Sequence, residues 1–168
     1  MPPRKNAPVP EKPAVRDALV AALRAALAAL THAAEQTREG ATHEDSRAEG
    51  DKDMRSTEQS YLARGQAMRV EDLAEQVQRL ETTPLRAFTD DEPIGPGALV
   101  QVSVDEEPRT FFVVSQGGGT ELAIGGAKVT VVTPASPVGR ALVGRRAGED
   151  FELMSRGAVR EWVIERVT

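Results

Sequence analysis

Apolar residues in the first half of the chain repeat every three or four positions, the spacing of a helix that packs along one side. In the first such run the repeating residues are Leu19, Leu23, Leu27, Leu30 and Ala34. In the second run they are Val70, Leu73, Val77 and Leu80, and Leu62 lies one further heptad and a residue back. Each run forms one narrow apolar seam, so the pattern predicts two long helices that pack on each other as an antiparallel coiled-coil hairpin.

The midpoint of the two runs predicts where this hairpin turns. We expect the first helix to begin near Ala14 and the second to end near Thr83, because Pro84 cannot continue a helix. The midpoint then falls near residues 48 and 49, so the turn is expected at 47–51, where Gly50 suits its dihedral angles. Each arm of about 30 residues would be about 45 Å long.

The sequence changes period after residues 84–97, a linker dense in proline, glycine and acid. Beyond it, apolar and polar residues alternate in five short runs, which predict five strands in a small, mostly antiparallel sheet. These runs are 98–104, 110–115, 128–133, 151–155 and 161–167. Ser136 and Pro137 predict the start of one short helix, which ends at Gly144. The predicted class is therefore α+β, with the sheet domain at residues 98–168.

Three consecutive glycines, 117–119, lie between two of the predicted strands. A phosphate-binding loop would need a lysine and a following helix, and neither is present here. We therefore interpret these glycines as a hairpin loop.

Composition narrows the possible functions. The 168 residues include 26 Asp and Glu against 21 Lys and Arg, a net charge of −5 that does not favour independent DNA binding. The absence of cysteine excludes disulfides and thiol chemistry and fits a reducing cytoplasm. Proline-rich residues 1–13 predict a disordered arm without an export signal, and no run reaches the about 20 apolar residues of a membrane span. We expect a cytoplasmic protein that does not enter membranes.

Five carboxylates gather where the hairpin turn is predicted. They are Glu44, Asp45, Glu49, Asp51 and Asp53. One interpretation is a solvated charge run, in which the dipole of the second helix favours acids at its start by about 0.3–1 kcal/mol each. The other is a set of oxygen ligands for Mg²⁺, which an exposed turn alone would hold weakly. Such a turn would be most useful inside the site of another protein, and the spacing alone leaves both interpretations open.

Two residues of the predicted second helix are unusual for a solvated coiled coil. Tyr61 either covers the seam or contacts a partner. Gly65 lowers helix stability by about 1 kcal/mol relative to alanine, which indicates close approach by the first helix or by a partner.

Three groups of residues carry a family resemblance. Residues 133–145, TPASPVGRALVGR, followed by Gly148 and Glu149, resemble the signature of the C-terminal domain of the bacterial Gre transcript-cleavage factors. In the hairpin, residues 41–44, 48–50 and 60–66 (SYLARGQ) resemble the shorter GreA/GreB-like branch of that family. The resemblance covers about residues 14–168.

This resemblance implies an FKBP-like C-terminal domain and a task at RNA polymerase. In the Gre family the globular domain docks at the rim of the polymerase secondary channel, and the coiled coil reaches the polymerase active site. Acidic tip residues there help to hold the second Mg²⁺, so that the polymerase cleaves the 3′ end of backtracked RNA. The resemblance thus implies a monomeric accessory factor rather than an enzyme, with RNA polymerase as partner, Mg²⁺ shared with the polymerase, and indirect contact with the RNA 3′ end.

The chain departs from the family at the tip. Gre tips carry an Asp and a Glu three residues apart, whereas Asp45 and Glu49 are four apart. Without an insertion Glu49 still matches the family Glu, but the Asp position falls on Ser46. By resemblance Asp45 and Glu49 are the catalytic and metal-binding candidates. Glu44, Asp51 and Asp53 are further metal ligands or parts of a tip that blocks the polymerase without cleavage.

The remaining site candidates are basic or lie in the C-terminal signature. Ser136, Pro137, Arg140 and Arg145, with neighbouring Arg146, are expected to bind the polymerase, although Arg140 could equally cap its own helix. Along the hairpin, Arg55 and Arg64, with Arg69, are candidates to face the RNA, and a solvated helix face is the alternative.

Two functions of other classes remain as alternatives. A peptidyl-prolyl isomerase would need an aromatic-lined proline pocket. The aromatic residues available in the C-terminal half are Phe111, Phe112, Phe151 and Trp162. Their alternation along strands predicts core positions instead. A purely structural coiled coil would not explain an acidic tip joined to this C-terminal signature.

Overall fold

The computed structural model describes residues 9–45, 52–155 and 157–168, and it describes no side chain between residues 40 and 57. The chain divides into two compact units, each considered by itself. The hairpin unit comprises residues 20–80, and the sheet unit comprises residues 1–19 together with 81–168. The predicted disordered arm falls largely on residues outside the described ranges, and the first helix begins at Lys12, two residues before its predicted start.

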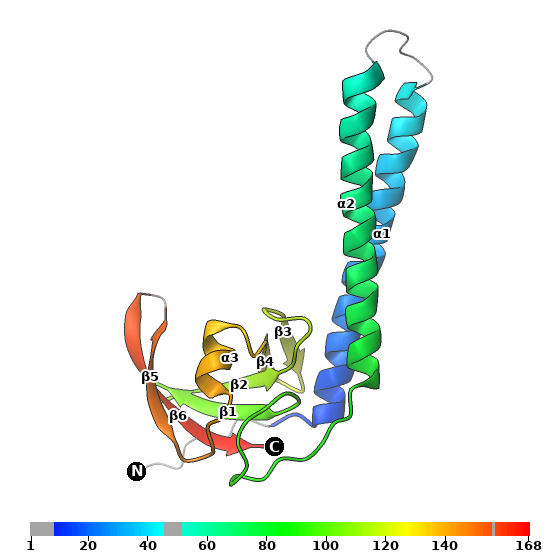
Figure 1. Ribbon diagram of the computed structural model, residues 1–168. Helices are drawn as coiled ribbons and strands as arrows, with labels where there is room; N and C mark the ends of the chain where they lie inside the picture. The colour runs from blue at the N-terminus through cyan, green and yellow to red at the C-terminus, as the bar shows by residue number, and fades with distance from the viewer. Residues whose placement is uncertain (1–8, 46–51, 156) are drawn as a thin grey trace. The chain divides into compact units, whose positions relative to one another are not determined.

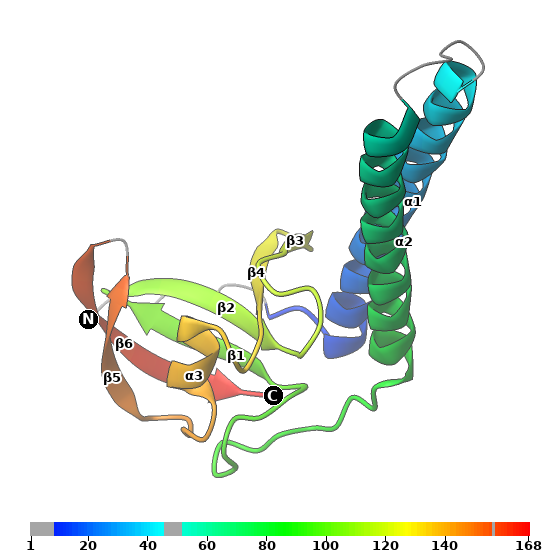
Figure 2. The ribbon, with the colours of Figure 1, turned by 45° about the horizontal axis from the view of Figure 1, so that its top comes forward.

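The hairpin unit is formed by α1 (Lys12–Asp45) and α2 (Lys52–Thr82), which run antiparallel and side by side (Figures 1 and 2). The seam between them is most closely packed at Leu23, Val77 and Leu80, each at most 7% exposed. Further along, the predicted seam positions are half-buried. These are Leu27, Leu30, Ala34, Val70 and Leu73. Most of the predicted seam is therefore confirmed.

Leu62 was predicted in the seam, and this prediction is wrong. Its side chain is 57% exposed, whereas Ala63 and Gln66 are half-buried in line with Val70. Ala63 lies seven residues before Val70 and keeps the heptad register. Leu62 lies eight residues before it, and the extra residue turns its side chain by about 100° away from α1.

The sheet unit contains one six-stranded sheet in the order β3-β4-β2-β1-β6-β5. Its strands are β1 (Leu99–Val104), β2 (Glu107–Val113), β3 (Glu121–Ile124), β4 (Ala127–Val132), β5 (Asp150–Ser155) and β6 (Ala158–Val167). All neighbouring pairs are antiparallel except β2 and β4, which are parallel. Five of these strands match the predicted ones, and β3 is additional.

The glycine loop at 117–119 is not the hairpin loop that we predicted. It carries the chain from β2 to the edge strand β3, and the hairpin turn is formed by Gly125 and Gly126 between β3 and β4. Both glycines of that turn have positive φ, 56° and 84°, which suits a tight turn. The parallel pairing of β2 with β4 follows from this detour.

The core of the sheet unit lies between one face of the sheet and α3 (Pro137–Leu142). Alternate strand residues such as Val102, Phe111 and Ile164 point into it, and Leu142 of α3 is fully buried against them. The α+β class, with two long helices followed by a mostly antiparallel sheet and one short helix, is therefore confirmed. Among the described helices, none combines the length and apolarity required to cross a membrane.

Candidate functional site

The acidic stretch falls where α1 gives way to α2. Glu44 and Asp45 are the last two residues of α1, and Asp53 is the second residue of α2, so the backbone brings them to the same end of the hairpin. Glu49 and Asp51 lie outside the described residues. From residue 20 to residue 45, α1 extends for about 40 Å. Convergence of the carboxylates on a metal stays a prediction, because the side chains concerned are not described.

Elsewhere on the chain, the described side chains include no group of three or more His, Asp or Glu residues suited to holding a metal ion. The acidic turn thus remains the candidate metal site, on sequence grounds.

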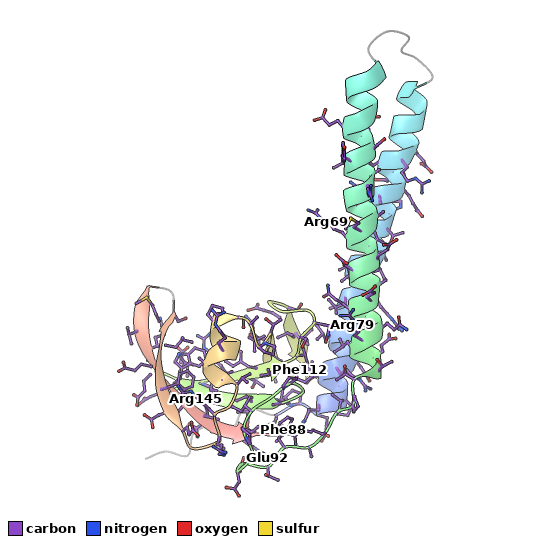
Figure 3. All side chains as sticks on the ribbon, viewed as in Figure 1. Arg69, Arg79, Phe88, Glu92, Phe112 and Arg145 are labelled. Atoms are coloured by element: carbon purple, nitrogen blue, oxygen red, sulfur yellow. The ribbon has the colours of Figure 1, made fainter. Side chains whose placement is uncertain are left out.

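The basic candidates on α2 are placed on its surface. Arg64 and Arg69 are exposed, and Figure 3 labels Arg69 on α2. Arg55 lies in the first turns of α2, within the range whose side chains are not described. Tyr61 is 72% exposed, so it does not cover the seam, and the interpretation of Tyr61 as a seam residue is wrong.

The C-terminal signature folds into a tight turn and the short helix α3. Ser136 caps α3, because its Oγ accepts a hydrogen bond from the Gly139 amide at 3.0 Å and donates one to the Thr133 carbonyl at 2.8 Å. Pro137 occupies the first turn of α3, where its missing N–H is not needed. A Cβ on Gly139 would lie 1.9 Å from the Thr133 carbonyl oxygen, so only glycine fits there. The signature therefore has a structural role whatever else it does.

Arg140 and Arg145 make contacts within the sheet unit. Arg140 donates to the Ala135 carbonyl at 2.7 Å while its side chain stays exposed. Arg145 donates to the Ala141 carbonyl at 2.7 Å and lies over the Phe151 ring, 4.5 Å from its centroid. Arg146 donates to the Asp91 carbonyl at 2.9 Å. Of the three, exposed Arg140 and Arg146 keep guanidinium nitrogens for a partner, whereas Arg145 is more fully engaged in the domain.

A second cluster joins the start of α1 to the linker, and no sequence pattern indicated it. Lys12 Nζ donates to the carbonyls of Arg86 and Gly97. Arg86 pairs with Glu92 at 2.8 Å, and Glu92 also accepts from the Thr89 amide at 2.9 Å. Lys12 is more than 70 positions away from Arg86 and Gly97, so no local spacing could reveal its contacts. Figure 3 labels Glu92 and Phe88 in this linker.

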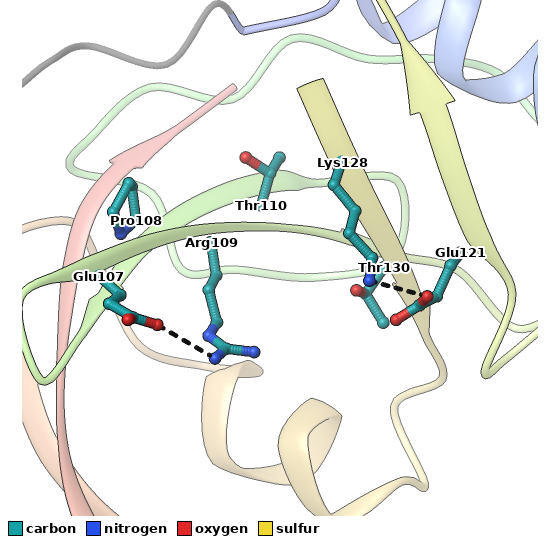
Figure 4. A pocket seen from close by; sticks show the side chains of 7 residues that line it. All are labelled: Glu107, Pro108, Arg109, Thr110, Glu121, Lys128 and Thr130. Carbon is teal, nitrogen blue, oxygen red and sulfur yellow. Dashed lines mark ion pairs between the residues drawn. The ribbon is translucent and has the colours of Figure 1, made fainter. Parts of the chain in front are cut away.

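A hollow of about 360 Å³ opens over β2, β3 and β4 (Figure 4). Its lining includes two ion pairs, Arg109 with Glu107 at 3.5 Å and Lys128 with Glu121 at 2.8 Å. The lining contains no aromatic residue, and its charges are already paired with each other. This hollow does not have the chemistry of a proline pocket.

The aromatic residues of the sheet unit fill its core, as predicted. Phe111 and Phe151 both stack against Trp162, with ring centroids 5.5 and 5.7 Å away, and all three are at most 8% exposed. Phe112 is fully buried. The isomerase alternative therefore gains no support from these residues.

Comparison with known proteins gives matches among solved structures. No family model matches the sequence, and no curated protein sequence matches it. GreA factor homolog 1 of Thermus thermophilus is 19% identical over 89% of this chain and 94% of its own, with a TM-score of 0.37. The same homolog of Thermus aquaticus is 20% identical over 90% and 94%, with a TM-score of 0.39. Elongation factor GreA/GreB of Nitrosomonas europaea is 22% identical over 57% and 78%, with a TM-score of 0.33.

The chain resembles Gre-type transcription factors. Its order of elements, two long helices followed by a sheet with one short helix, is the architecture expected of that family. Because identities are at most 22% and TM-scores stay below 0.5, these likenesses do not assign a function by themselves.

Proposed function

We propose that this chain is a Gre-like transcription factor that binds RNA polymerase. Its acidic hairpin turn enters the secondary channel of the polymerase and stimulates Mg²⁺-dependent cleavage of backtracked RNA 3′ ends. The observation that carries the proposal is the position of the acidic stretch. It joins the ends of two antiparallel helices, of 34 and 31 residues, in a chain that also holds the Gre-like signature at 133–149.

The proposed cleavage reaction requires only metal ligands from the factor itself. Two metal ions about 4 Å apart stabilise the attacking and leaving oxygens of a phosphoryl transfer. A Mg²⁺ ion that keeps several waters is bound weakly until further oxygen ligands reach it. Carboxylates from Asp45 and Glu49, delivered into the polymerase site, would complete that shell. The factor thus lends ligands, and the polymerase remains the enzyme.

One observation favours a second candidate, a channel-binding regulator that inhibits the polymerase without cleavage. Asp45 is the last residue of α1, and Glu49 follows it four residues later in the sequence, outside the described residues. The two carboxylates therefore do not share the spacing of three residues found in cleavage-active Gre tips. A metal held in a different geometry would block nucleotide addition instead of promoting hydrolysis.

A transcript-cleavage assay separates these functions. A stalled, backtracked elongation complex is incubated at fixed Mg²⁺ with the wild type, Asp45→Ala or Glu49→Ala. Glu39→Ala is the matched control, because Glu39 is an exposed acid of α1 before the acidic stretch. We expect shortened RNA with the wild type and Glu39→Ala, and at least about a hundredfold less with Glu49→Ala.

Slower nucleotide addition without cleavage would identify the inhibitor instead. If the folded wild type in excess neither cleaves, slows addition nor binds the polymerase, the proposal is wrong and the resemblance concerns the fold alone.

A further inference from the structure

Gly65 lies inside α2 without a structural reason in its own chain. A Cβ at this position would meet nothing within 4 Å, and the residue is exposed. Close approach by α1, one of the two explanations predicted from the sequence, is therefore excluded among the described residues. Because glycine is a poor helix former, alanine would be the better residue for α2 alone. What remains is close approach by a partner.

Large apolar side chains around Gly65 are exposed on the surface of α2. Tyr61 and Met68 lie four residues before and three residues after it, on the same side of the helix, and they are 72% and 58% exposed. Seven residues correspond to two turns, so the two side chains are about 10 Å apart along the axis. Gly65 lies between them in the sequence and adds no side chain. Leu62, 57% exposed, extends this surface.

The charges beside these apolar residues fit a protein better than a nucleic acid. Between Glu58 and Asp72, α2 carries three carboxylates and two guanidiniums, which does not favour a polyanion. Arg64 and Arg69 are exposed, and no ion pair joins them to another described side chain. Tyrosine, methionine and arginine are enriched where proteins bind each other. Carboxylates on the partner would face the two arginines.

We propose that Tyr61, Gly65 and Met68 form a docking face for an α-helix of RNA polymerase. Side chains of that helix pack between Tyr61 and Met68, and the missing side chain at Gly65 lets the two helix axes approach closely. Acidic residues of the partner helix then face Arg64 and Arg69. The inference rests on the proposed function, since it names the surface by which the hairpin is held in that partner.

The test measures binding and stability together. The affinity of full-length protein for core RNA polymerase is measured for the wild type, Gly65→Ala and Gly65→Leu, first without nucleic acid and then with a backtracked RNA. The oligomeric state of each protein is measured alongside. Ala67→Leu is the matched control, because Ala67 is exposed but lies on the other side of α2, about 160° around the helix. We expect Gly65→Leu to weaken binding by about tenfold or more and Gly65→Ala by a few fold. Gly65→Ala should at the same time raise the Tm by about 2–4 °C.

A variant that is more stable yet binds the polymerase less tightly cannot owe its weaker binding to a folding defect. Unchanged affinity in both Gly65 variants, with wild type that binds, overturns the inference and leaves the proposed function standing. If the Gly65 variants lose affinity only when a backtracked RNA is present, this face binds RNA, and the inferred docking of a protein helix is wrong. Loss of a wild-type dimer with unchanged polymerase affinity makes a second copy the occupant. If the wild type does not bind polymerase at all, the proposed function and this inference both fail.

Discussion

The guanidinium of Arg86 lies over the ring of Phe88, with 3.7 Å from its central carbon to the ring centroid. The ammonium of Lys12, the first residue of α1, lies 4.8 Å from the same centroid. Phe88 itself is 6% exposed and belongs to the core of the sheet unit. One ring in the linker therefore holds the start of α1 and the sheet core together, through apolar burial and two cation–π contacts.

Replacing this ring should weaken the sheet unit. We expect Phe88→Ala to lower the free energy of unfolding by about 3–5 kcal/mol, because it removes a buried aromatic side chain. Phe88→Leu keeps most of the apolar volume and should cost clearly less. Urea unfolding followed by the fluorescence of Trp162, the single tryptophan, measures both. Equal losses of unfolding free energy in the two variants would show that the buried apolar volume of Phe88 does not determine its contribution to stability.

The ion pair beside this ring predicts a pH dependence. The Arg86 side chain, helped by the Thr89 amide, holds the pKa of Glu92 below its ordinary value. A carboxylate with a lowered folded pKa stabilises the fold above its unfolded pKa, and this stabilisation is lost as the pH falls through the folded pKa. Glu92→Gln should therefore be less stable than the wild type at neutral pH, and the difference should close below about pH 4.

Denaturant unfolding at several pH values checks this prediction. Glu152→Gln, at an exposed carboxylate of β5, is the control and should follow the wild type more closely. A gap for Glu92→Gln that stays constant between neutral and acidic pH would contradict the electrostatic explanation.

The two glycines Gly139 and Gly95 should respond in opposite ways to alanine. At Gly139 the new Cβ would lie 1.9 Å from the Thr133 carbonyl oxygen, so the turn before α3 must open. We expect a loss of about 2 kcal/mol or more in the free energy of unfolding. At Gly95 a Cβ would meet nothing within 4 Å, so Gly95→Ala should stay within about 0.5 kcal/mol of the wild type. Thermal unfolding of the two variants compares them, and similar Tm values would refute the close approach.

The seam of the hairpin can be tested with two leucines. Leu23 is 7% exposed and Leu62 is 57% exposed. Leu23→Ala should lower the free energy of unfolding by about 2–3 kcal/mol, whereas Leu62→Ala should change it by less than about 0.5 kcal/mol. Far-ultraviolet circular dichroism reports the helices during unfolding. A larger effect at Leu62 than at Leu23 would contradict the exposed position of Leu62 and place it in the seam, as the sequence predicted.

The sequence predicted the helices and strands that have a strong period. Predictions from it failed where the structure depends on a single residue or on a contact between distant residues. The strands around Phe111 and Trp162 were predictable, because alternation continues over several residues. The edge strand β3 has four residues between glycine-containing loops, which is too short to show a period. Its insertion makes β2 and β4 parallel neighbours, and strand order is not written in any local pattern.

The candidate site divides in the same way. The position of the acidic stretch between the two helices and the role of Ser136 as a helix cap could be predicted, because both depend on neighbours in the chain. The contacts of Arg145 with Ala141 and Phe151 could be found only from the fold. For Gly65 the sequence predicted close approach either by the first helix or by a partner. The empty space around Gly65 excludes the first helix among the described residues.

The division of the chain also bears on how it folds as it is made. The sheet unit includes residues 12–19 and 81–168, which are separated in the chain by residues 20–80. Closing such a long loop in a free chain costs entropy before any contact compensates. The two helices form through contacts nearer in sequence, and their antiparallel pairing brings residues 20 and 80 together. A hairpin that forms first on the ribosome therefore closes this loop in advance, and residues 12–19 meet the sheet as soon as its last strand emerges.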